Sequence, residues 1–233
     1  MNGLNIYAQV EQYLGFDEEV VALHNTFKDV IEEIKPNSLI DIGCGQGVFL
    51  ESLQDNNNIS TLFGVDLSSS QIEICNQKNI DAKCIDICKV STKYDVATAI
   101  FDVINYIPKK NIRNFFKCVY KVLNTNGYFV FDINTLYGFE EVADGSISIN
   151  NDDKFISIDA LYENKVLETN ITVFTKDQDL YRKETGLIEQ FYHSTEFLKK
   201  ELKLCGFEVE SAMSFTLHDV EEFDKQIFIA KKV

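Results

Sequence analysis

The chain has little positive charge and no long apolar run. Lys and Arg number 22 against 37 Asp and Glu, which gives a formal net charge of −15 at pH 7. Proteins that bind long nucleic acids usually present a basic face, so this balance argues against a nucleic-acid partner. No apolar stretch approaches the roughly 20 residues that a membrane-spanning helix needs, and no basic segment followed by an apolar core opens the chain. We therefore expect no membrane partner and a cytoplasmic location.

The cysteines also lack an organised pattern. None of the six belongs to a C-x-x-C pair, and they stand at positions 44, 75, 84, 88, 118 and 205. Several fall in apolar runs, which predicts buried, reduced thiols in a cytoplasmic protein. Cys84 and Cys88 have three residues between them, but no histidine stands near them to complete a metal site. The sequence therefore predicts no bound metal.

What is present is an ordinary globular composition. The 233 residues are 45% hydrophobic and 25% charged. This length suits one domain, or one domain with a cap.

The most informative stretch is 38–50, with the sequence SLIDIGCGQGVFL. An apolar strand runs into three glycines, at 43, 45 and 47, and continues as an apolar helix. Glycines allow a tight turn and let a ligand approach the bare backbone. The following helix points free N–H groups and its positive dipole end at that ligand. The stretch therefore predicts a cradle for a nucleotide-like ligand.

The details of this stretch limit which ligand it holds. A dinucleotide fingerprint would need glycine at position 48, where Val48 stands, and a phosphate-binding P-loop would need G-K-[ST], which is absent. Asp41 instead places a carboxylate at the strand end, which suits a cationic ligand better than a pyrophosphate. A nicotinamide oxidoreductase is accordingly disfavoured.

Further candidate site residues follow later strands. Asp66 ends the strand predicted at 61–66 and lies 23 positions after Gly43. A carboxylate there can accept hydrogen bonds from both hydroxyls of a ribose. Strands are also predicted at 82–86 and, almost continuously apolar, at 94–101. Open α/β sheets bind ligands at the carboxyl ends of central strands, so the exit of the last one supplies four more candidates: Phe101, Asp102, Asn105 and Tyr106.

The order of elements predicts the fold class. Helices at 4–14 and 17–34 come first, and strands then alternate with helices up to a fifth strand at 128–133. This alternation indicates an α/β fold with a doubly wound, mostly parallel sheet. A helix expected to open at Pro108 precedes the fifth strand.

Residues 144–193 break that alternation. Three stretches with strand character, 155–162, 166–176 and 180–193, predict an inserted antiparallel β meander. A helix at 195–205 and two final strands, at 207–215 and 226–230, resume the main fold. We therefore expect one α/β domain made of 1–143 and 194–233, with 1–35 as an N-terminal helical cap. The insertion, 144–193, would contact substrate or a second subunit.

The glycine stretch, Asp66, Asp86-Ile87 and the exit of the fourth strand together resemble class I S-adenosylmethionine (AdoMet) methyltransferases, over most of residues 38–233. Phe101-Asp102-x-x-Asn105-Tyr106 and the segment 131–135 (FDINT) are similar to a bacterial subgroup with a β insertion after strand five. That subgroup includes amino-sugar N-methyltransferases. The resemblance implies a seven-stranded Rossmann-like methyltransferase fold, with its last strand antiparallel.

The resemblance also implies site residues. An acid and an apolar residue at Asp86-Ile87 would hold the adenine amino group and one ring face. Tyr7, Tyr13 and Phe16 of the N-terminal helices would cover the cofactor, although core packing is an equal alternative for each. The residues implied to bind AdoMet, or its product S-adenosyl-L-homocysteine, are Asp41, Gly43, Cys44, Gly45, Gly47, Asp66, Leu67, Asp86, Ile87, Phe101 and Tyr13.

The implied function is transfer of a methyl group by in-line displacement to N or O of a small molecule (EC 2.1.1.-), in which alignment and desolvation do most of the work. Substrate contacts are expected from Asp102, Asn105 and Tyr106. No catalytic base is assigned. Tyr106, Tyr192 and His193 are the candidates, with a surface or strand-edge histidine as the alternative for the last.

A non-catalytic alternative stays open at this point. The same fold would serve an interaction protein that forms a homodimer, or docks a partner, through the β insertion. Val103 and Leu136 stand where relatives often have a small polar residue and a proline, so the resemblance leaves the substrate undetermined.

Overall fold

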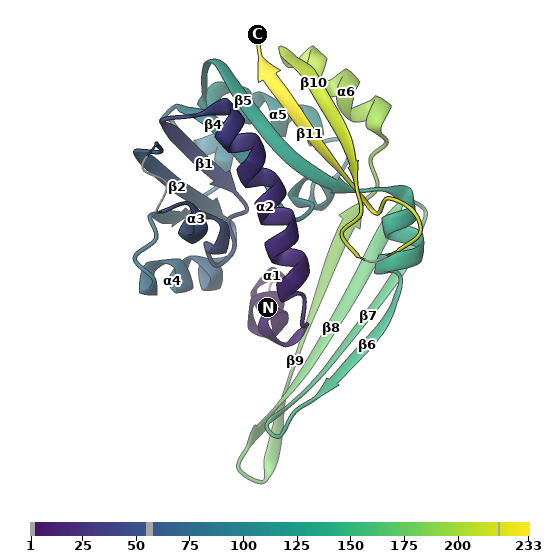
Figure 1. Ribbon diagram of the computed structural model, residues 1–233. Coiled ribbons are helices and arrows are strands. Elements are labelled where there is room, and N and C mark those ends of the chain that lie inside the picture. Colours follow the sequence, from purple (N-terminus) through teal and green to yellow (C-terminus); the bar gives the residue numbers. More distant parts are fainter. Residues whose placement is uncertain (1–2, 55–57, 219) are drawn as a thin grey trace.

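The computed structural model describes residues 3–54, 58–218 and 220–233. Its main sheet has seven strands in the order β10-β11-β5-β4-β1-β2-β3 (Figure 1). The strands are β1 (Ser38–Ile42), β2 (Thr61–Asp66), β3 (Ala82–Cys84), β4 (Tyr94–Ala99), β5 (Leu123–Asn134), β10 (Phe207–Phe215) and β11 (Lys225–Lys232). The five strands from β1 to β5 pair in parallel, and β11 is antiparallel to both β5 and β10. The predicted fold class is confirmed.

Helices cover both faces of this sheet. One face is covered by α2 (Asp17–Ile34), α3 (Val48–Leu53) and α4 (Ser69–Gln77), and the other by α5 (Ile112–Val122) and α6 (Thr195–Leu204). Each long helix buries one apolar stripe at helical spacing, for example Ile112, Phe116 and Val119 of α5. The start of α5 differs from the prediction: the helix begins at Ile112 after a turn, and Pro108 lies before it. Among the described helices, none has the length and apolar run needed to cross a membrane.

The insertion forms a second sheet of four antiparallel strands that projects away from the first (Figure 1). These are β6 (Gly145–Asn150), β7 (Lys154–Glu163), β8 (Val166–Asp177) and β9 (Leu180–Phe191), and the short helical segment η4 (Gly138–Ala143) leads into them. The sequence predicted only the last three strands. β6 was missed because it is an edge strand with mostly exposed residues, so it carries little of the burial pattern that marks a strand.

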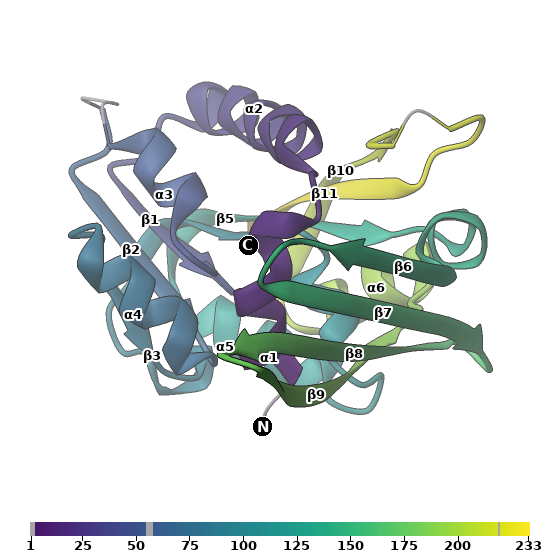
Figure 2. The same cartoon turned by 90° about the horizontal axis from the view of Figure 1, so that it is seen from below.

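The N-terminal helix α1 (Gly3–Val10) lies between the two sheets (Figure 2). Ile6 and Val10 are fully buried in a cluster with side chains of β7, β8 and β9. At Gly3 the approach to β9 is so close that a Cβ would lie 2.2 Å from the carbonyl oxygen of Leu187. On the other side, Ser68 Oγ, just before α4, donates to Asn5 Oδ1 at 2.7 Å. One short helix thus fixes the insertion against the glycine-loop side of the fold.

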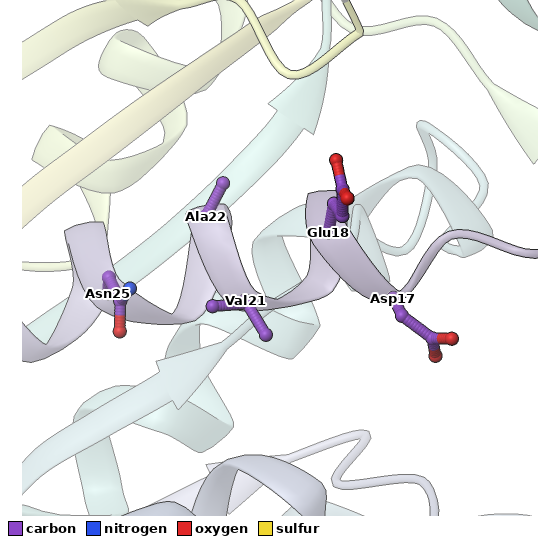
Figure 3. Close-up of a pocket in the computed structure, with 5 residues that line it drawn as sticks. All are labelled: Asp17, Glu18, Val21, Ala22 and Asn25. Carbon is purple, nitrogen blue, oxygen red and sulfur yellow. The ribbon is translucent and has the colours of Figure 1, made fainter.

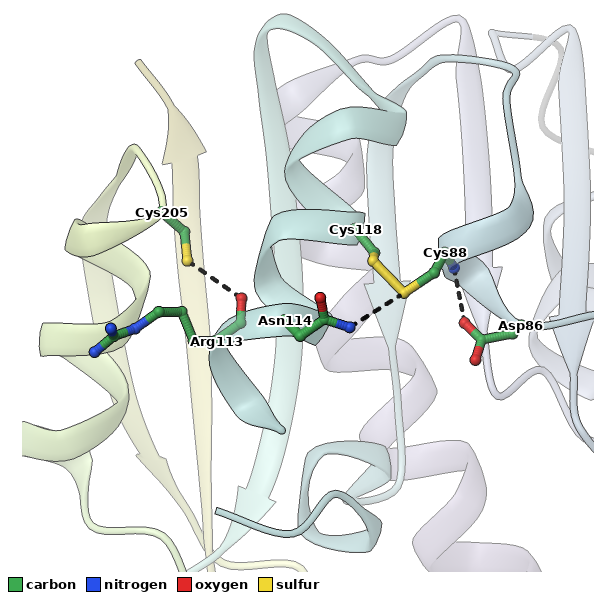
Figure 4. Close-up of a disulfide and its surroundings, with 6 residues drawn as sticks. All are labelled: Asp86, Cys88, Arg113, Asn114, Cys118 and Cys205. Carbon is green, nitrogen blue, oxygen red and sulfur yellow. Dashed lines mark hydrogen bonds between the residues drawn. A yellow bond between two sulfur atoms is a disulfide. The ribbon is translucent and has the colours of Figure 1, made fainter. Parts of the chain in front are cut away.

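The structure corrects the prediction for two cysteines. Cys88 and Cys118, with Cα atoms 4.8 Å apart, form a disulfide that links the 3-10 helix η2 (Ile87–Lys89) to α5 (Figure 4). No local motif marks this pair, because 30 residues separate its members and only the packing of η2 on α5 brings them together. Among the described residues the remaining cysteines, Cys44, Cys75, Cys84 and Cys205, are free thiols.

Candidate functional site

The glycine loop connects β1 to α3, and its three glycines serve different purposes. All have positive φ: 72° at Gly43, 52° at Gly45 and 75° at Gly47. A Cβ at Gly43 would come within 2.6 Å of the Val103 side chain, and one at Gly47 within 2.6 Å of Ile80. A Cβ at Gly45 would meet nothing within 4 Å. Gly45 is therefore the position where the loop backbone faces open space that a ligand could occupy.

Asp66, at the end of β2, binds the backbone of the glycine loop. Its Oδ2 accepts a hydrogen bond from the Gly45 N–H at 3.0 Å, and its Oδ1 accepts one from the Ser68 N–H at 2.7 Å. Burial raises the pKa of Asp66, while these backbone N–H groups lower it in part. A carboxylate offers about four lone-pair sites, so acceptor capacity remains. The next residue, Leu67, is exposed beside it.

Asp41 lies beneath the loop in β1 and is 3% exposed. Its Oδ1 accepts a hydrogen bond from Thr98 Oγ1 at 2.7 Å. The pKa of Asp41 is raised to about 7, mainly by burial and in part by the charge of Asp66, against the lowering effect of the Thr98 hydroxyl. A nearby positive charge would favour the ionised form, which is consistent with a cationic ligand.

Glu11 extends the site onto the N-terminal segment. It opens the 3-10 helix η1 (Glu11–Tyr13), and its Oε2 accepts from Gln46 Nε2 at 3.1 Å and from Gln71 Nε2 at 3.4 Å. Gln46 belongs to the glycine loop and Gln71 to α4. The buried Oε1 of Gln71 has no hydrogen-bond partner among the residues that the structure describes. The N-terminal segment therefore borders the loop with a carboxylate.

A second group of acids and phenols lies between α1 and the exit of β4. Burial raises the pKa of the Tyr7 phenol, and the charges of Glu11 and Asp102 raise it further. Burial likewise raises the pKa of Tyr106, to which Asp102, Tyr7 and Glu11 add. The Tyr7 and Tyr106 rings both pack against the apolar cluster that contains Ile6 and Val10. We call the four residues Tyr7, Glu11, Asp102 and Tyr106 the acidic cluster.

At the exit of β4, two consecutive residues adopt left-handed backbone conformations. They are Phe101, with φ 61°, and Asp102, with φ 53°. Asp102 Oδ1 accepts from the ammonium of Lys225 at 2.7 Å, and Asp102 Oδ2 accepts from Gln190 Nε2. The carboxylate is therefore held by β11 of the main sheet and by β9 of the insertion.

The sequence matches the methyltransferase domain family over residues 22–212, which is most of the chain. This chain belongs to that family. It is an AdoMet-dependent methyltransferase, with AdoMet as its cofactor. Its chemistry is thus methyl transfer.

Individual relatives agree with this family. The chain is 26% identical, over 210 residues, to a protein of Geobacillus sp. (strain WCH70) whose name assigns it provisionally as a methyltransferase, with 83% of this chain and 84% of that protein covered. It is similar in fold to an AdoMet-dependent methyltransferase from Clostridium acetobutylicum ATCC 824, with a TM-score of 0.78 at 21% identity over 97% of this chain and 96% of the other. It is also similar to a sugar N-methyltransferase from Streptoalloteichus sp. ATCC 53650, with a TM-score of 0.73 at 16% identity over 97% and 91%.

The predicted adenine residues lie at the start of η2. Asp86 Oδ1 accepts from the Cys88 N–H at 2.8 Å and so caps this short helix, while the Ile87 side chain is buried. The disulfide at Cys88 therefore fixes the segment that carries both residues (Figure 4). A role for Asp86 and Ile87 in the methyltransferase cofactor site stays a prediction.

Asn105 supports the site from within. Its side chain is fully buried, its Nδ2 donates to the Phe191 carbonyl at 2.9 Å, and its Oδ1 accepts from the Asn134 N–H at 3.0 Å. These bonds hold η3 (Val103–Tyr106) against the end of β9 and β5. Its predicted contact with substrate stays a prediction.

The other predicted residues lie elsewhere in the methyltransferase. The Tyr13 ring faces the insertion, with Lys154 Nζ 5.1 Å from its centroid. The Tyr192 ring packs edge-on against Phe139 at 6.2 Å. Buried His193 donates from Nε2 to the Ile107 carbonyl at 2.9 Å, and burial lowers its pKa. Among the three candidate bases, Tyr106 is therefore the one that the structure groups with Asp102.

Sequence reasoning missed Glu11, Gln190 and Lys225. Nothing local marks them, because a charged or amide residue in a helix or at a strand end is usually exposed. Lys225 stands one position before the strand predicted at 226–230, and its burial shows only in the folded protein.

A surface depression along α2 does not belong to this site. Its lining residues are Asp17, Glu18, Val21, Ala22 and Asn25, all from one helix (Figure 3). Figure 3 shows the carboxylates of Asp17 and Glu18 pointing in different directions, so they do not converge on a common point.

Proposed function

We propose that this methyltransferase transfers the methyl group to N or O of a small molecule bound at the acidic cluster, and that an amine nitrogen is the preferred acceptor. The observation that carries this proposal is the packing of Tyr7 and Tyr106 on one apolar cluster, where the charges of Glu11 and Asp102 act on both phenols. Carboxylates and phenols accept hydrogen bonds from an ammonium and attract its charge.

The cofactor would lie on the glycine loop. Gly45 leaves open space beside the backbone, and Asp66 keeps acceptor capacity for ribose hydroxyls. Asp41 lies buried beneath the loop, where a bound cation would favour its ionised form. The unpartnered Oε1 of Gln71 adds a further buried acceptor. AdoMet carries an ammonium and a sulfonium, so it fits this set of donors and acceptors. When bound, it supplies a methyl group made electrophilic by the sulfonium.

The residues of the acidic cluster would then bind and orient the acceptor. Alignment of the reacting nitrogen and exclusion of water supply most of the rate enhancement. The net charge of −15 would also favour the approach of cationic molecules at low ionic strength. The sugar N-methyltransferase named above, which shares the fold, is consistent with nitrogen as the accepting atom.

The test is a transfer assay with AdoMet and paired small molecules that differ only in an amine or a hydroxyl, followed by mass spectrometry of the products. We expect methylated amines in preference to methylated alcohols. Methylation of hydroxyls alone would overturn the preference for nitrogen, and methylation of nucleic acid but of no small molecule would overturn the proposal.

A matched pair of variants tests the cofactor site. Asp66→Ala should weaken AdoMet binding at least about tenfold by calorimetry, because it removes an ionised acceptor of ribose hydroxyls. Asp81→Ala, an exposed acid near β3, should leave the affinity unchanged. Equal affinities in the two variants would mean that Asp66 does not hold the ribose.

A further inference from the structure

Lys225 is a buried cation at the start of β11, with 2% of its surface exposed. Its Nζ donates to Asp102 Oδ1 at 2.7 Å, to Asp132 Oδ2 at 2.9 Å and to Asn134 Oδ1 at 2.9 Å. These three bonds use all the hydrogens of an ammonium. Burial lowers the pKa of Lys225, but the carboxylates of Asp102 and Asp132 raise it by more. The side chain is therefore a fixed positive charge.

The Lys225 ammonium binds a residue in a strained turn of the backbone. Phe101 and Asp102 both have left-handed conformations, which residues other than glycine rarely adopt. Asp132 Oδ2 accepts from the Asp102 N–H at 3.1 Å as well as from Lys225. Lys225 and Asp132 together therefore hold the Asp102 side chain and backbone in this turn.

The other oxygen of Asp102 belongs to the insertion. Gln190 of β9 is buried and donates from Nε2 to Asp102 Oδ2. The Asp102 carboxylate thus bonds through one oxygen to the main sheet and through the other to the inserted sheet. Its orientation therefore depends on the relative position of the two sheets. If β9 shifted, the Asp102 carboxylate would lose its bond to Gln190 and keep its bond to Lys225.

We propose that Lys225 is a positioning residue of the acceptor site. It orients Asp102 so that this carboxylate completes the acidic cluster only when Gln190 of the insertion is bonded to its other oxygen. The inference rests on the proposed function, in which Asp102 helps to bind the acceptor. Lys225 acts through Asp102 and does not touch the acceptor.

The kinetic test compares Lys225→Met with Lys231→Met, which changes a partly exposed lysine on the same strand. Lys225→Met should raise the acceptor KM about tenfold, which is the loss expected for one charge-assisted hydrogen bond, and should leave AdoMet affinity within about twofold. Lys225→Arg, which keeps the charge, should recover part of the loss, and Lys231→Met should match the parent protein. An unchanged acceptor KM in folded Lys225→Met, or an equal loss for acceptor and AdoMet, would overturn the proposal.

A second measurement does not need the acceptor. Hydrogen–deuterium exchange of the AdoMet-bound protein should become faster in residues 102–106 and 187–191 of Lys225→Met, and stay unchanged in β1 and β2. If that variant does not fold, Gln190→Leu serves instead, with faster exchange expected in 102–106. Unchanged exchange there, or a uniform increase across the sheet, would overturn the inference. A parent protein that methylates no amine or alcohol would overturn the proposed function alone.

Discussion

At the scale of single residues, the three loop glycines should respond differently to substitution. Alanine at Gly45 or Gly47 costs about 1 kcal/mol for positive φ. Gly47→Ala also places a Cβ against Ile80, so it should lower the free energy of unfolding by more than Gly45→Ala does. Gly45→Ala should instead weaken AdoMet binding by about tenfold or more, because its Cβ enters the space assigned to the ligand. Denaturant unfolding and calorimetry measure the two effects.

Each variant is the control for the other, because both carry the same chemical change in the same loop. If Gly45→Ala bound AdoMet as tightly as the parent, the open space at Gly45 would not be the cofactor site.

Asp41 should make stability depend on pH. Its pKa is about 7 in the folded protein against an ordinary 3.8, so the folded state favours the protonated form. The contribution of this residue is therefore fully present below pH 3.8 and is lost as pH rises through 7. Between pH 6 and 8.5 the parent should lose about 1 kcal/mol of unfolding free energy through Asp41, and Asp41→Asn should not.

The measurement is urea denaturation of the AdoMet-free protein at both pH values, with Asp81→Asn as an exposed control. The same pH dependence in Asp41→Asn and in the parent would contradict the assigned pKa.

At the scale of elements, the disulfide should stabilise η2 against α5. Cys118→Ala should lower the free energy of unfolding by about 2–4 kcal/mol under non-reducing conditions. It should also weaken AdoMet binding if Asp86 and Ile87 hold the adenine, because Cys88 follows them directly. A reducing agent should shift the parent toward the variant and leave the variant unchanged.

Cys205→Ala is the control, since Cys205 is a free thiol whose Sγ donates to the Arg113 carbonyl at 3.5 Å (Figure 4). Equal stability of parent and Cys118→Ala in the absence of reductant would mean that the bridge does not stabilise the fold.

At the scale of the whole molecule, α1 couples the two sheets. Ile6 is fully buried among Ile156, Ile171 and Ile188 of the insertion. Ile6→Ala should cost about 2–5 kcal/mol, as large-to-small core substitutions do. The loss should appear as faster hydrogen exchange in β8 and β9, with little change in β1 and β4. Val21→Ala, at an exposed position of α2, is the matched control.

An Ile6→Ala protein with faster exchange throughout both sheets would mean that they unfold as one unit. A protein with no change would mean that α1 does not hold the insertion in place.

The sequence alone determined the frame of this methyltransferase. Apolar runs such as β4, the helical spacing of α5 and the alternation of strands with helices depend on local backbone geometry, which the order of residues records directly. The glycine loop and Asp66 could be predicted for the same reason, because the loop follows one predicted strand and Asp66 ends the next.

Only the tertiary structure decided the contacts between distant residues. Lys225 and Asp102 are 123 positions apart, and Cys88 and Cys118 are 30 apart. A lysine or cysteine in a sequence does not reveal whether a partner will face it, because that depends on strand order and on the seating of the insertion. The sequence therefore determined the family and the glycine loop, while the folded chain determined how the acidic cluster is assembled.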